Sequence, residues 1–269
     1  MEKQATIRED ITFEGIGLHT GQSCKIVLHP AKENTGIVFY KKGTYIPANY
    51  KHVVNTDHST DLGKDGQIVK TVEHLMAVLY MLGIDNLIIE VQKGTEIPAY
   101  DGSGYHFYKE LKSKVLYLPE YKDYLVIDRP LETLNCQAKI VAEPYEDLLV
   151  IYSGYVKGFI ESSQVVYRGD ARQVVFARTF CYDYEVEHLR RKGLAKGGSL
   201  KNAVVLGEGF VYNKEGLRSK DEPIRHKLLD LLGDLSLLGK RIRGKVVSYG
   251  GGHSLNVAFV KNLVDLYLL

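Results

Sequence analysis

Apolar residues recur at helical spacing in two leucine-rich stretches of the chain, and a glycine ends each stretch. In residues 72–82 apolar side chains repeat every three or four positions, and Gly83 follows as a stop signal. The same kind of pattern predicts a second helix over about 223–238. A shorter helix is expected over about 106–114.

Short apolar runs bounded by turn residues predict β-strands in both halves of the chain. These runs are 24–28, 36–40 and 87–91 in the first half, and 125–127, 138–142 and 148–152 in the second half. Across residues 245–260 the pattern favours a strand, a glycine turn and a second strand. The chain is therefore predicted to be an α+β protein.

The polar, turn-like residues 119–123 separate two stretches that have a similar order of elements. They predict a boundary between a first α+β domain at 1–118 and a second at 124–269. The two long helices begin alike, with Val72-Glu73-His74-Leu75 in one and Ile224-Arg225-His226-Lys227 in the other. Two similar sheet-plus-helices halves are expected to face each other with their helices inside.

Each predicted half also carries an insertion. Residues 50–67 are rich in Asn, Asp, His, Thr and Gly and predict an irregular hairpin. Residues 177–206 predict a strand, a helix and a strand, and Tyr182, Val186 and Leu189 form an apolar stripe along that helix. From the spacing alone, this stripe is an ordinary helix face packed on the core.

The 269-residue chain has the composition of a globular protein and a formal net charge of +2. Lys and Arg are scattered among Asp and Glu, so no nucleic-acid partner is expected. The cysteines, Cys24, Cys136 and Cys181, have no Cys-x-x-Cys spacing, which suits a reducing compartment and offers no thiolate zinc site. Without an apolar signal segment or a transmembrane segment, the protein is expected to be cytoplasmic, and any membrane contact is expected to be peripheral.

One predicted helix carries a pair of side chains that can share a cation. His226 and Asp230 stand four residues apart, so both leave the same helix face, and Asp234 follows one turn later. A catalytic zinc ion takes three protein ligands and leaves one position for water. His74 is the best third ligand because it opens the other helix beside Glu73, a candidate general base. Taken alone, a His-x3-Asp pair is more often a surface pair or a capped core histidine.

Several motifs occur together and in order along the chain. They are Phe13-Glu14-Gly15-Ile16-Gly17-Leu18-His19-Thr20-Gly21, Thr71-Val72-Glu73-His74-Leu75, Ile97-Pro98-Ala99-Tyr100-Asp101-Gly102-Ser103, Ala177-Arg178-Thr179-Phe180, Gly197-Gly198-Ser199-Leu200, Arg225-His226-Lys227 with Asp230 and Gly233-Asp234, and Gly252-His253-Ser254-Leu255-Asn256. In this combination the chain closely resembles the UDP-3-O-acyl-N-acetylglucosamine deacetylases, zinc enzymes of lipid A biosynthesis. The resemblance implies a β-α-α-β sandwich with the site between its two domains.

The resemblance also implies a catalytic centre for amide hydrolysis. Zinc held by His74, His226 and Asp230 is expected to lower the pKa of its water, and Glu73 is expected to take the proton as general base. Iron(II) suits two histidines and one carboxylate as well as zinc does.

Four further residues complete the expected chemistry. Thr179 is expected to hydrogen-bond the developing oxyanion. His253 is expected to act as cation and general acid at the amine, with Asp234 orienting it and raising its pKa; without the other motifs it is a loop histidine bonded to backbone. Lys227 is placed at the rim of the cleft, where an ammonium can meet a diphosphate, and a solvated helix lysine is the alternative.

In the family, the second insertion forms a hydrophobic passage for the acyl chain of the substrate. Carried over to this chain, the lining is Tyr182, Val186, Ala195, Gly198, Leu200, Ala203 and Val205, with Phe180 also expected to bind substrate. Small residues suit a channel, and they suit a tight turn as well. His19 is expected near the site, and His58 is a further candidate for the cleft.

The implied substrate is UDP-3-O-acyl-N-acetylglucosamine, hydrolysed to acetate and the free 2-amine. Two alternatives stay open: a zinc deacetylase of another N-acetylated sugar, and a catalytically silent nucleotide-sugar or acyl-chain binder with a structural metal. Structural zinc sites usually have four protein ligands, whereas three ligands and a base are expected here, which favours catalysis. The sequence leaves open the acyl-chain length, the metal used in cells and the oligomeric state.

Overall fold

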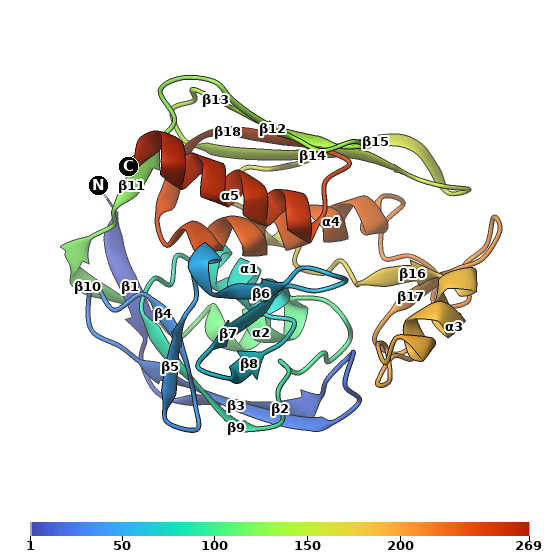
Figure 1. The fold of residues 1–269 in the computed structure, drawn as a ribbon, viewed down its shortest axis with the longest axis horizontal. Helices are drawn as coiled ribbons and strands as arrows, with labels where there is room; N and C mark the ends of the chain where they lie inside the picture. The colour runs from blue at the N-terminus through green and yellow to red at the C-terminus, as the bar shows by residue number, and fades with distance from the viewer. Residues whose placement is uncertain (1, 269) are drawn as a thin grey trace.

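The computed structural model describes residues 2–268, and two sheets in it face each other across a layer of helices (Figure 1). The first sheet has the strand order β2-β3-β9-β4-β5. Its strands are β2 (Ile11–Ile16), β3 (Ser23–Pro30), β4 (Ile37–Lys41), β5 (Thr44–Pro47) and β9 (Leu87–Lys93). Helices α1 (Glu73–Leu82) and α2 (Tyr105–Leu111) belong to this half, and Ile26, Phe39 and Leu75 share its hydrophobic core.

The second sheet has the strand order β12-β13-β18-β14-β15, and β11 pairs with β18. Its strands are β11 (Tyr124–Val126), β12 (Leu131–Leu134), β13 (Lys139–Glu143), β14 (Leu148–Val156), β15 (Ile160–Tyr167) and β18 (Arg241–Tyr249). Helices α4 (Glu222–Leu235) and α5 (His253–Tyr267) lie under it, and Val150, Leu228 and Phe259 share its core. The layers confirm the predicted α+β class and the β-α-α-β sandwich.

The two halves meet where α1 packs against α4. A Cβ atom on Gly233 of α4 would lie 2.2 Å from the carbonyl oxygen of Glu73, so any side chain at this position would collide with the first turn of α1. Core residues of α1 also contact both halves, because Leu75 belongs to the first core and Ala77 to the second. The absence of a side chain at Gly233 therefore sets the spacing of the middle layer.

Besides the pair β1 (Lys3–Ile7) and β10 (Val115–Tyr121), two small groups of strands lie outside the main sheets. The first group is β6 (Val53–Asn55), β7 (Asp61–Lys64) and β8 (Gln67–Val69), preceded by the 3-10 turn η1 (Tyr50–His52). The second group is β16 (Phe180–Tyr182) and β17 (Val204–Leu206), joined by α3 (Asp183–Arg191). Two further 3-10 turns are η2 (Ala171–Gln173) and η3 (Ser236–Leu238).

Two expectations from the sequence were wrong. The second strand expected within 245–260 is the start of helix α5, where Leu255, Phe259 and Leu263 are buried at helical spacing. A short apolar run after glycines fits either element, and the pattern becomes clearly helical only beyond residue 260. Residues 119–121 are not a turn but the end of β10 (Val115–Tyr121), which pairs with β1 (Lys3–Ile7).

The irregularity around Pro119 has a local cause. The pairing of β1 with β10 shifts between Lys3 and Ala5, whose partners are Tyr121 and Tyr117. Proline donates no backbone hydrogen bond, so it is tolerated in a strand at such an irregularity. The domain boundary expected near this segment stays a prediction.

Among the helices within residues 2–268, none combines the length and the apolar character needed to cross a bilayer.

The close approach at Gly233 yields a prediction about stability. We expect Gly233→Ala to lower the free energy of unfolding by about 1–3 kcal/mol, because the added methyl group forces α1 and α4 apart. Urea denaturation measures the change. Gly252→Ala is the control, since no atom lies within 4 Å of a Cβ built at that position. An equal loss in both variants would contradict the proposed role of the contact.

Candidate active site

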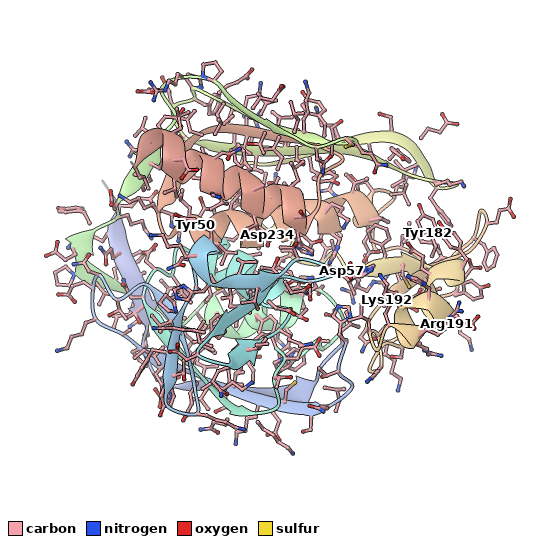
Figure 2. The ribbon with its side chains drawn as sticks, in the orientation of Figure 1. Tyr50, Asp57, Tyr182, Arg191, Lys192 and Asp234 are labelled. Carbon is pink, nitrogen blue, oxygen red and sulfur yellow. The ribbon has the colours of Figure 1, made fainter. Side chains whose placement is uncertain are left out.

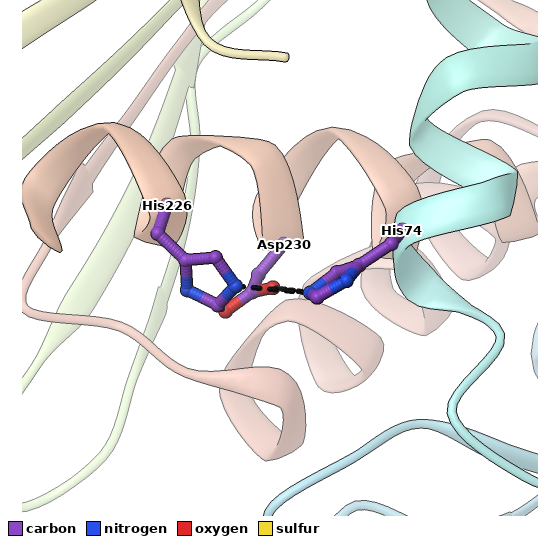
Figure 3. Close-up of side chains that lie close together, drawn as sticks. All are labelled: His74, His226 and Asp230. Carbon is purple, nitrogen blue, oxygen red and sulfur yellow. Dashed lines mark hydrogen bonds and ion pairs between the residues drawn. The ribbon is translucent and has the colours of Figure 1, made fainter. Parts of the chain in front are cut away.

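Three buried side chains from the middle layer converge on one point. His226 and Asp230 lie one turn apart on α4, and His74 faces them from the first turn of α1 (Figure 3). One donor atom from each of the three lies within 4.8 Å of the others. The Nε2 atoms of His74 and His226 are 2.9 Å apart, and Nε2 of His74 is 3.5 Å from Oδ1 of Asp230.

The chemistry of these donors fits a divalent cation. Within residues 2–268, Nδ1 of His226 and Oδ1 of Asp230 are buried and have no hydrogen-bond partner. Buried polar atoms almost always have a hydrogen-bond partner. Buried nitrogen and oxygen atoms that lack one and lie in the same place therefore indicate that a ligand binds there. Two nitrogens and one oxygen are a zinc donor set that leaves a coordination position open.

The protonation states of His226 and Asp230 also suit cation binding. Burial lowers the pKa of His226 to about 3, so its imidazole is neutral and can offer a lone pair. Burial opposes ionisation of Asp230, but the electrostatic attraction of the surrounding imidazoles and Lys227 outweighs it and holds the pKa of the carboxyl below its usual range. Cys181 lines the same pocket, and burial raises the pKa of its thiol to about 11, so no thiolate competes there.

Glu73 lies beside this cluster at the start of α1 and is almost fully buried. Burial raises its pKa to about 7, against the opposing charges of His253 and His74. Its Oε2 accepts a hydrogen bond from the backbone N–H of Thr60 at 3.0 Å. A carboxyl group with a pKa near neutrality can accept and release a proton at working pH.

His253 begins α5 on the other side of Glu73. Its Nε2 is 3.8 Å from Oε1 of Glu73, and its Nδ1 is 2.8 Å from Oδ2 of Asp234. Burial by itself lowers the pKa of His253, but the charge of Asp234 and its hydrogen bond raise it to about 10. The imidazole is therefore protonated at neutral pH. Asp234 lies inside the middle layer and is fully buried (Figure 2).

These groups open into a cavity of about 600 Å³. Of the residues expected at the site, its walls include Glu73, His74, His226, Asp230, His253, Thr179, Lys227, Phe180, His19, His58, Tyr182, Val186, Ala195, Gly198, Leu200, Ala203 and Val205. Asp234 stands behind His253 and does not line the cavity. The structure thus brings the expected residues together in one pocket.

One wall of the cavity comes from the second group of strands and α3. Tyr182, Val186 and Leu189 line the cavity, so the stripe borders a hollow instead of a filled core. The small residues Ala195 and Gly198 also form a tight turn. Ala195 has a φ of +50°, and its carbonyl accepts a hydrogen bond from the N–H of Gly198. A Cβ atom on Gly198 would meet that carbonyl at 3.1 Å, so Gly198 serves a tight turn.

Thr179 is held in place by its buried neighbour Arg178. The guanidinium of Arg178 donates to both carboxylate oxygens of Glu222, at 2.8 and 3.0 Å, and Glu222 is the first residue of α4. The backbone N–H of Thr179 donates to Gly102 in the first half. These bonds fix the segment that presents Thr179 beside the cluster.

The remaining polar residues lie around the cluster. Nζ of Lys227 is 3.8 Å from Oδ2 of Asp230 and lies over the ring of Phe180. His19 is buried, and burial lowers its pKa. Lys192 of the α3 segment reaches within 3.7 Å of Asp57, so the two peripheral groups of strands approach each other beside the cavity (Figure 2).

Sequence reasoning missed several residues of this neighbourhood. Tyr212 lines the cavity although it lies beyond the expected end of the insertion. Asn256 donates to Asp234 at 2.8 Å, and it was given no role although it stands in the same motif as His253. Thr60 contacts both Glu73 and Asp234, but it lies in an irregular polar segment without any periodic signal.

A buried cluster of two imidazoles and a carboxylate, with a carboxyl base and a protonated imidazole beside it, is typical of metal-dependent hydrolases. The sequence profile of the UDP-3-O-acyl N-acetylglycosamine deacetylases matches residues 4–265. The chain belongs to this family of hydrolases.

Curated relatives agree over nearly the whole chain. The UDP-3-O-acyl-N-acetylglucosamine deacetylase of Aquifex aeolicus (strain VF5) is 49% identical over 264 residues, which cover 98% of this chain and 93% of that protein. The protein of the same name from Anaeromyxobacter dehalogenans (strain 2CP-C) is 41% identical and covers 97% and 87%. That from Syntrophotalea carbinolica is 38% identical with the same coverage.

The converging donors predict the effect of removing one ligand. We expect His226→Ala and Asp230→Ala each to weaken zinc binding by more than about 100-fold, which exceeds the usual cost of losing a supporting residue. Elemental analysis of dialysed protein and zinc titration measure this. His188→Ala is the control, because His188 is exposed on α3. Full zinc content in both ligand variants would rule out this cluster as the metal site.

Proposed function

We propose that the chain catalyses zinc-dependent hydrolysis of the N-acetyl group of UDP-3-O-acyl-N-acetylglucosamine. The products are acetate and the 2-amino sugar nucleotide, and the reaction is the committed step of lipid A biosynthesis in the cytoplasm. One observation carries the proposal: the His74–His226–Asp230 cluster, Glu73 and His253 open into one cavity that has an apolar wall. The names of the relatives suggest the substrate.

His74, His226 and Asp230 would hold the cation, and iron(II) fits the same donors as zinc. When bound, such an ion supplies a Lewis acid for the amide carbonyl and lowers the pKa of an attacking water. The neutral imidazole of His226 and the ionised carboxyl of Asp230 are in the form that a cation requires.

Glu73 and His253 divide the proton transfers between them. Glu73 takes a proton from the attacking water, because its pKa of about 7 leaves much of it ionised near neutrality. His253 carries a proton at Nε2 and gives it to the departing amine, since its pKa of about 10 keeps it protonated. The hydroxyl of Thr179, which lines the same cavity, donates a hydrogen bond to the developing oxyanion.

The rest of the cavity suits the two ends of the substrate. Lys227 offers a cation at the edge of the cluster for the diphosphate, and Phe180 lies against it. The wall formed by Tyr182, Val186 and Val205 offers an apolar surface for the acyl chain. His19 stands at the side of the first half and contributes to the enclosure.

Acetate release from UDP-3-O-acyl-N-acetylglucosamine, with and without a chelator, tests this function. Turnover should disappear with the chelator and return when zinc is added. UDP-N-acetylglucosamine without the acyl chain is the comparison substrate, and an N-acetylated sugar without UDP is a second one. Preferred hydrolysis of either comparison substrate would favour a deacetylase of another sugar. Binding of the sugar nucleotide without acetate release would indicate a silent binding protein.

The position of Glu73 beside the ligands separates catalysis from metal binding. We expect Glu73→Gln to retain zinc and to lose about 10²–10⁴-fold in kcat, because the amide cannot accept the proton. Metal content and steady-state kinetics on the same preparation measure both effects. Near-normal turnover in this variant would assign the base to another residue.

The raised pKa values of Glu73 and His253 predict a bell-shaped profile of kcat/KM against pH. The rising limb belongs to Glu73, which must lose its proton, and lies at or below pH 7 because a bound cation lowers its pKa further. The falling limb belongs to His253, which must keep its proton, and lies at or below pH 10. His253→Gln should remove the falling limb. Its persistence would assign that limb to the attacking water.

The apolar wall predicts a dependence on acyl-chain length. Each buried methylene favours binding by up to about 0.8 kcal/mol, so every two methylenes removed should lower kcat/KM by up to about 15-fold. Ala203→Leu should harm long-chain substrates most, because Ala203 lines the cavity. Lys201→Leu is the control, since Lys201 is exposed on the same segment. Equal losses on long and short chains would place the acyl group elsewhere.

A further inference from the structure

Thr60 is a fully buried residue immediately before β7, and it touches both proton-transfer groups. Its backbone N–H donates to Oε2 of Glu73 at 3.0 Å. Its hydroxyl donates to Oδ1 of Asp234 at 2.6 Å and lies 3.2 Å from Nδ1 of His253. One residue of the first half therefore contacts the base of its own half and the Asp234–His253 pair of the other half.

The hydroxyl of Thr60 controls how the Asp234 carboxylate is turned. Oδ2 of Asp234 receives His253 and Asn256, both at 2.8 Å, whereas Oδ1 receives only Thr60 among the hydrogen bonds found within residues 2–268. The last torsion of an aspartate is soft, so bonds to both oxygens are needed to fix the plane of the carboxylate. A hydrogen bond to a charged acceptor is short and strong, as the 2.6 Å distance here indicates.

Thr60 thus hydrogen-bonds one oxygen of each carboxylate. Its backbone N–H binds Oε2 of Glu73, and its hydroxyl binds Oδ1 of Asp234. The atoms that remain for proton transfer are Oε1 of Glu73 and Nε2 of His253, which are 3.8 Å apart where both residues line the cavity. With Nδ1 of His253 bonded to Asp234, the exchangeable proton of the imidazolium is directed from Nε2 into the cavity.

The position of Thr60 is itself fixed by the backbone. Its carbonyl accepts a hydrogen bond from the N–H of Val72 at 3.0 Å, one residue before α1 begins. The neighbouring Asp61 accepts from Ser59 within its own segment and from the N–H of Thr71, and this second bond ties the same two segments together. Thr60 is therefore held at the start of α1, independently of its contact with Asp234.

From these contacts we infer that Thr60 is a positioning residue for the proton-transfer pair: its hydroxyl orients Asp234 and, through it, His253 against Glu73. The inference rests on the proposed function, because it assigns Thr60 to the proton transfers of that reaction. The backbone bond to Glu73 survives any substitution of the side chain, so the hydroxyl can be tested by itself.

Three variants separate positioning from simple support of the fold. Thr60→Val keeps the shape of the side chain and removes the hydroxyl, and we expect kcat to fall about 10–100-fold while KM changes little. Thr60→Ser restores the hydroxyl and should recover most of the parent kcat. Ser59→Ala is the matched control, because Ser59 is a buried neighbour whose hydroxyl bonds Asp61 and neither proton-transfer group.

A double-mutant cycle tests whether Thr60 acts through Asp234. If it does, Thr60→Val should cost much less in an Asp234→Asn background than in the parent, since contacting residues in one network are not additive. The same loss of kcat in both backgrounds would overturn the inference. Equal activity of Thr60→Val and the parent would overturn it too, as would a Thr60→Ser variant as impaired as Thr60→Val.

A measurement without substrate keeps this inference separate from the proposed function. In protein labelled with 15N at histidine, the Nδ1 proton of His253, assigned by its loss in His253→Gln, should be protected from exchange. Thr60→Val should speed its exchange, and Thr60→Ser and Ser59→Ala should not. Unchanged exchange in Thr60→Val would overturn the inference. A parent protein that does not release acetate would overturn the proposed function instead.

Discussion

The contact between Gly233 of α4 and the backbone of Glu73 is the constraint on which the site depends. Because no side chain separates the two helices there, the first turn of α1 lies against the last turn of α4. This single approach brings His74 to the pair on α4 and also brings Glu73 close to Asp234 and His253. A wider spacing would separate the proposed ligands and the proposed proton-transfer groups together, since both sets lie on the same two helices and the start of α5.

Two buried carboxyl groups in this layer, those of Glu73 and Asp234, differ in their hydrogen-bond partners. Within residues 2–268, the Glu73 side chain accepts one hydrogen bond, so desolvation dominates and its pKa rises to about 7. Asp234 accepts hydrogen bonds from Thr60, His253 and Asn256, which offset the cost of burying its charge. The charge of Asp234 in turn keeps His253 protonated. A carboxyl group with a raised pKa and a protonated imidazole therefore stand side by side, because Glu73 and Asp234 have different partners.

The apolar wall of the cavity is attached to the first half by backbone hydrogen bonds. The N–H groups of Lys196 and Gly197 donate to His19 and Leu18, at 3.1 and 3.0 Å. A Cβ atom on Gly197 would lie 2.2 Å from the carbonyl of Gly17, so the two loops touch main chain to main chain. The cavity consequently stays open, lined by Tyr182, Val186 and Leu189. Without these backbone hydrogen bonds, α3 would be free to pack its apolar face onto the core.

Local pattern in the sequence determined helices α1 and α4, the central strands of both sheets, and the placement of His226 and Asp230 together, because helical periodicity puts residues four apart on one face. The start of the other predicted helix added His74 and Glu73 as candidates, and the combination of scattered motifs favoured His253, which no local spacing connects to them. Helix α5 was missed because its first residues follow glycines and fit a strand equally well. Thr60, Asn256 and the gap at Gly233 became visible only in the tertiary structure. Their roles arise from contacts between residues up to 193 positions apart, which periodicity along the chain does not encode.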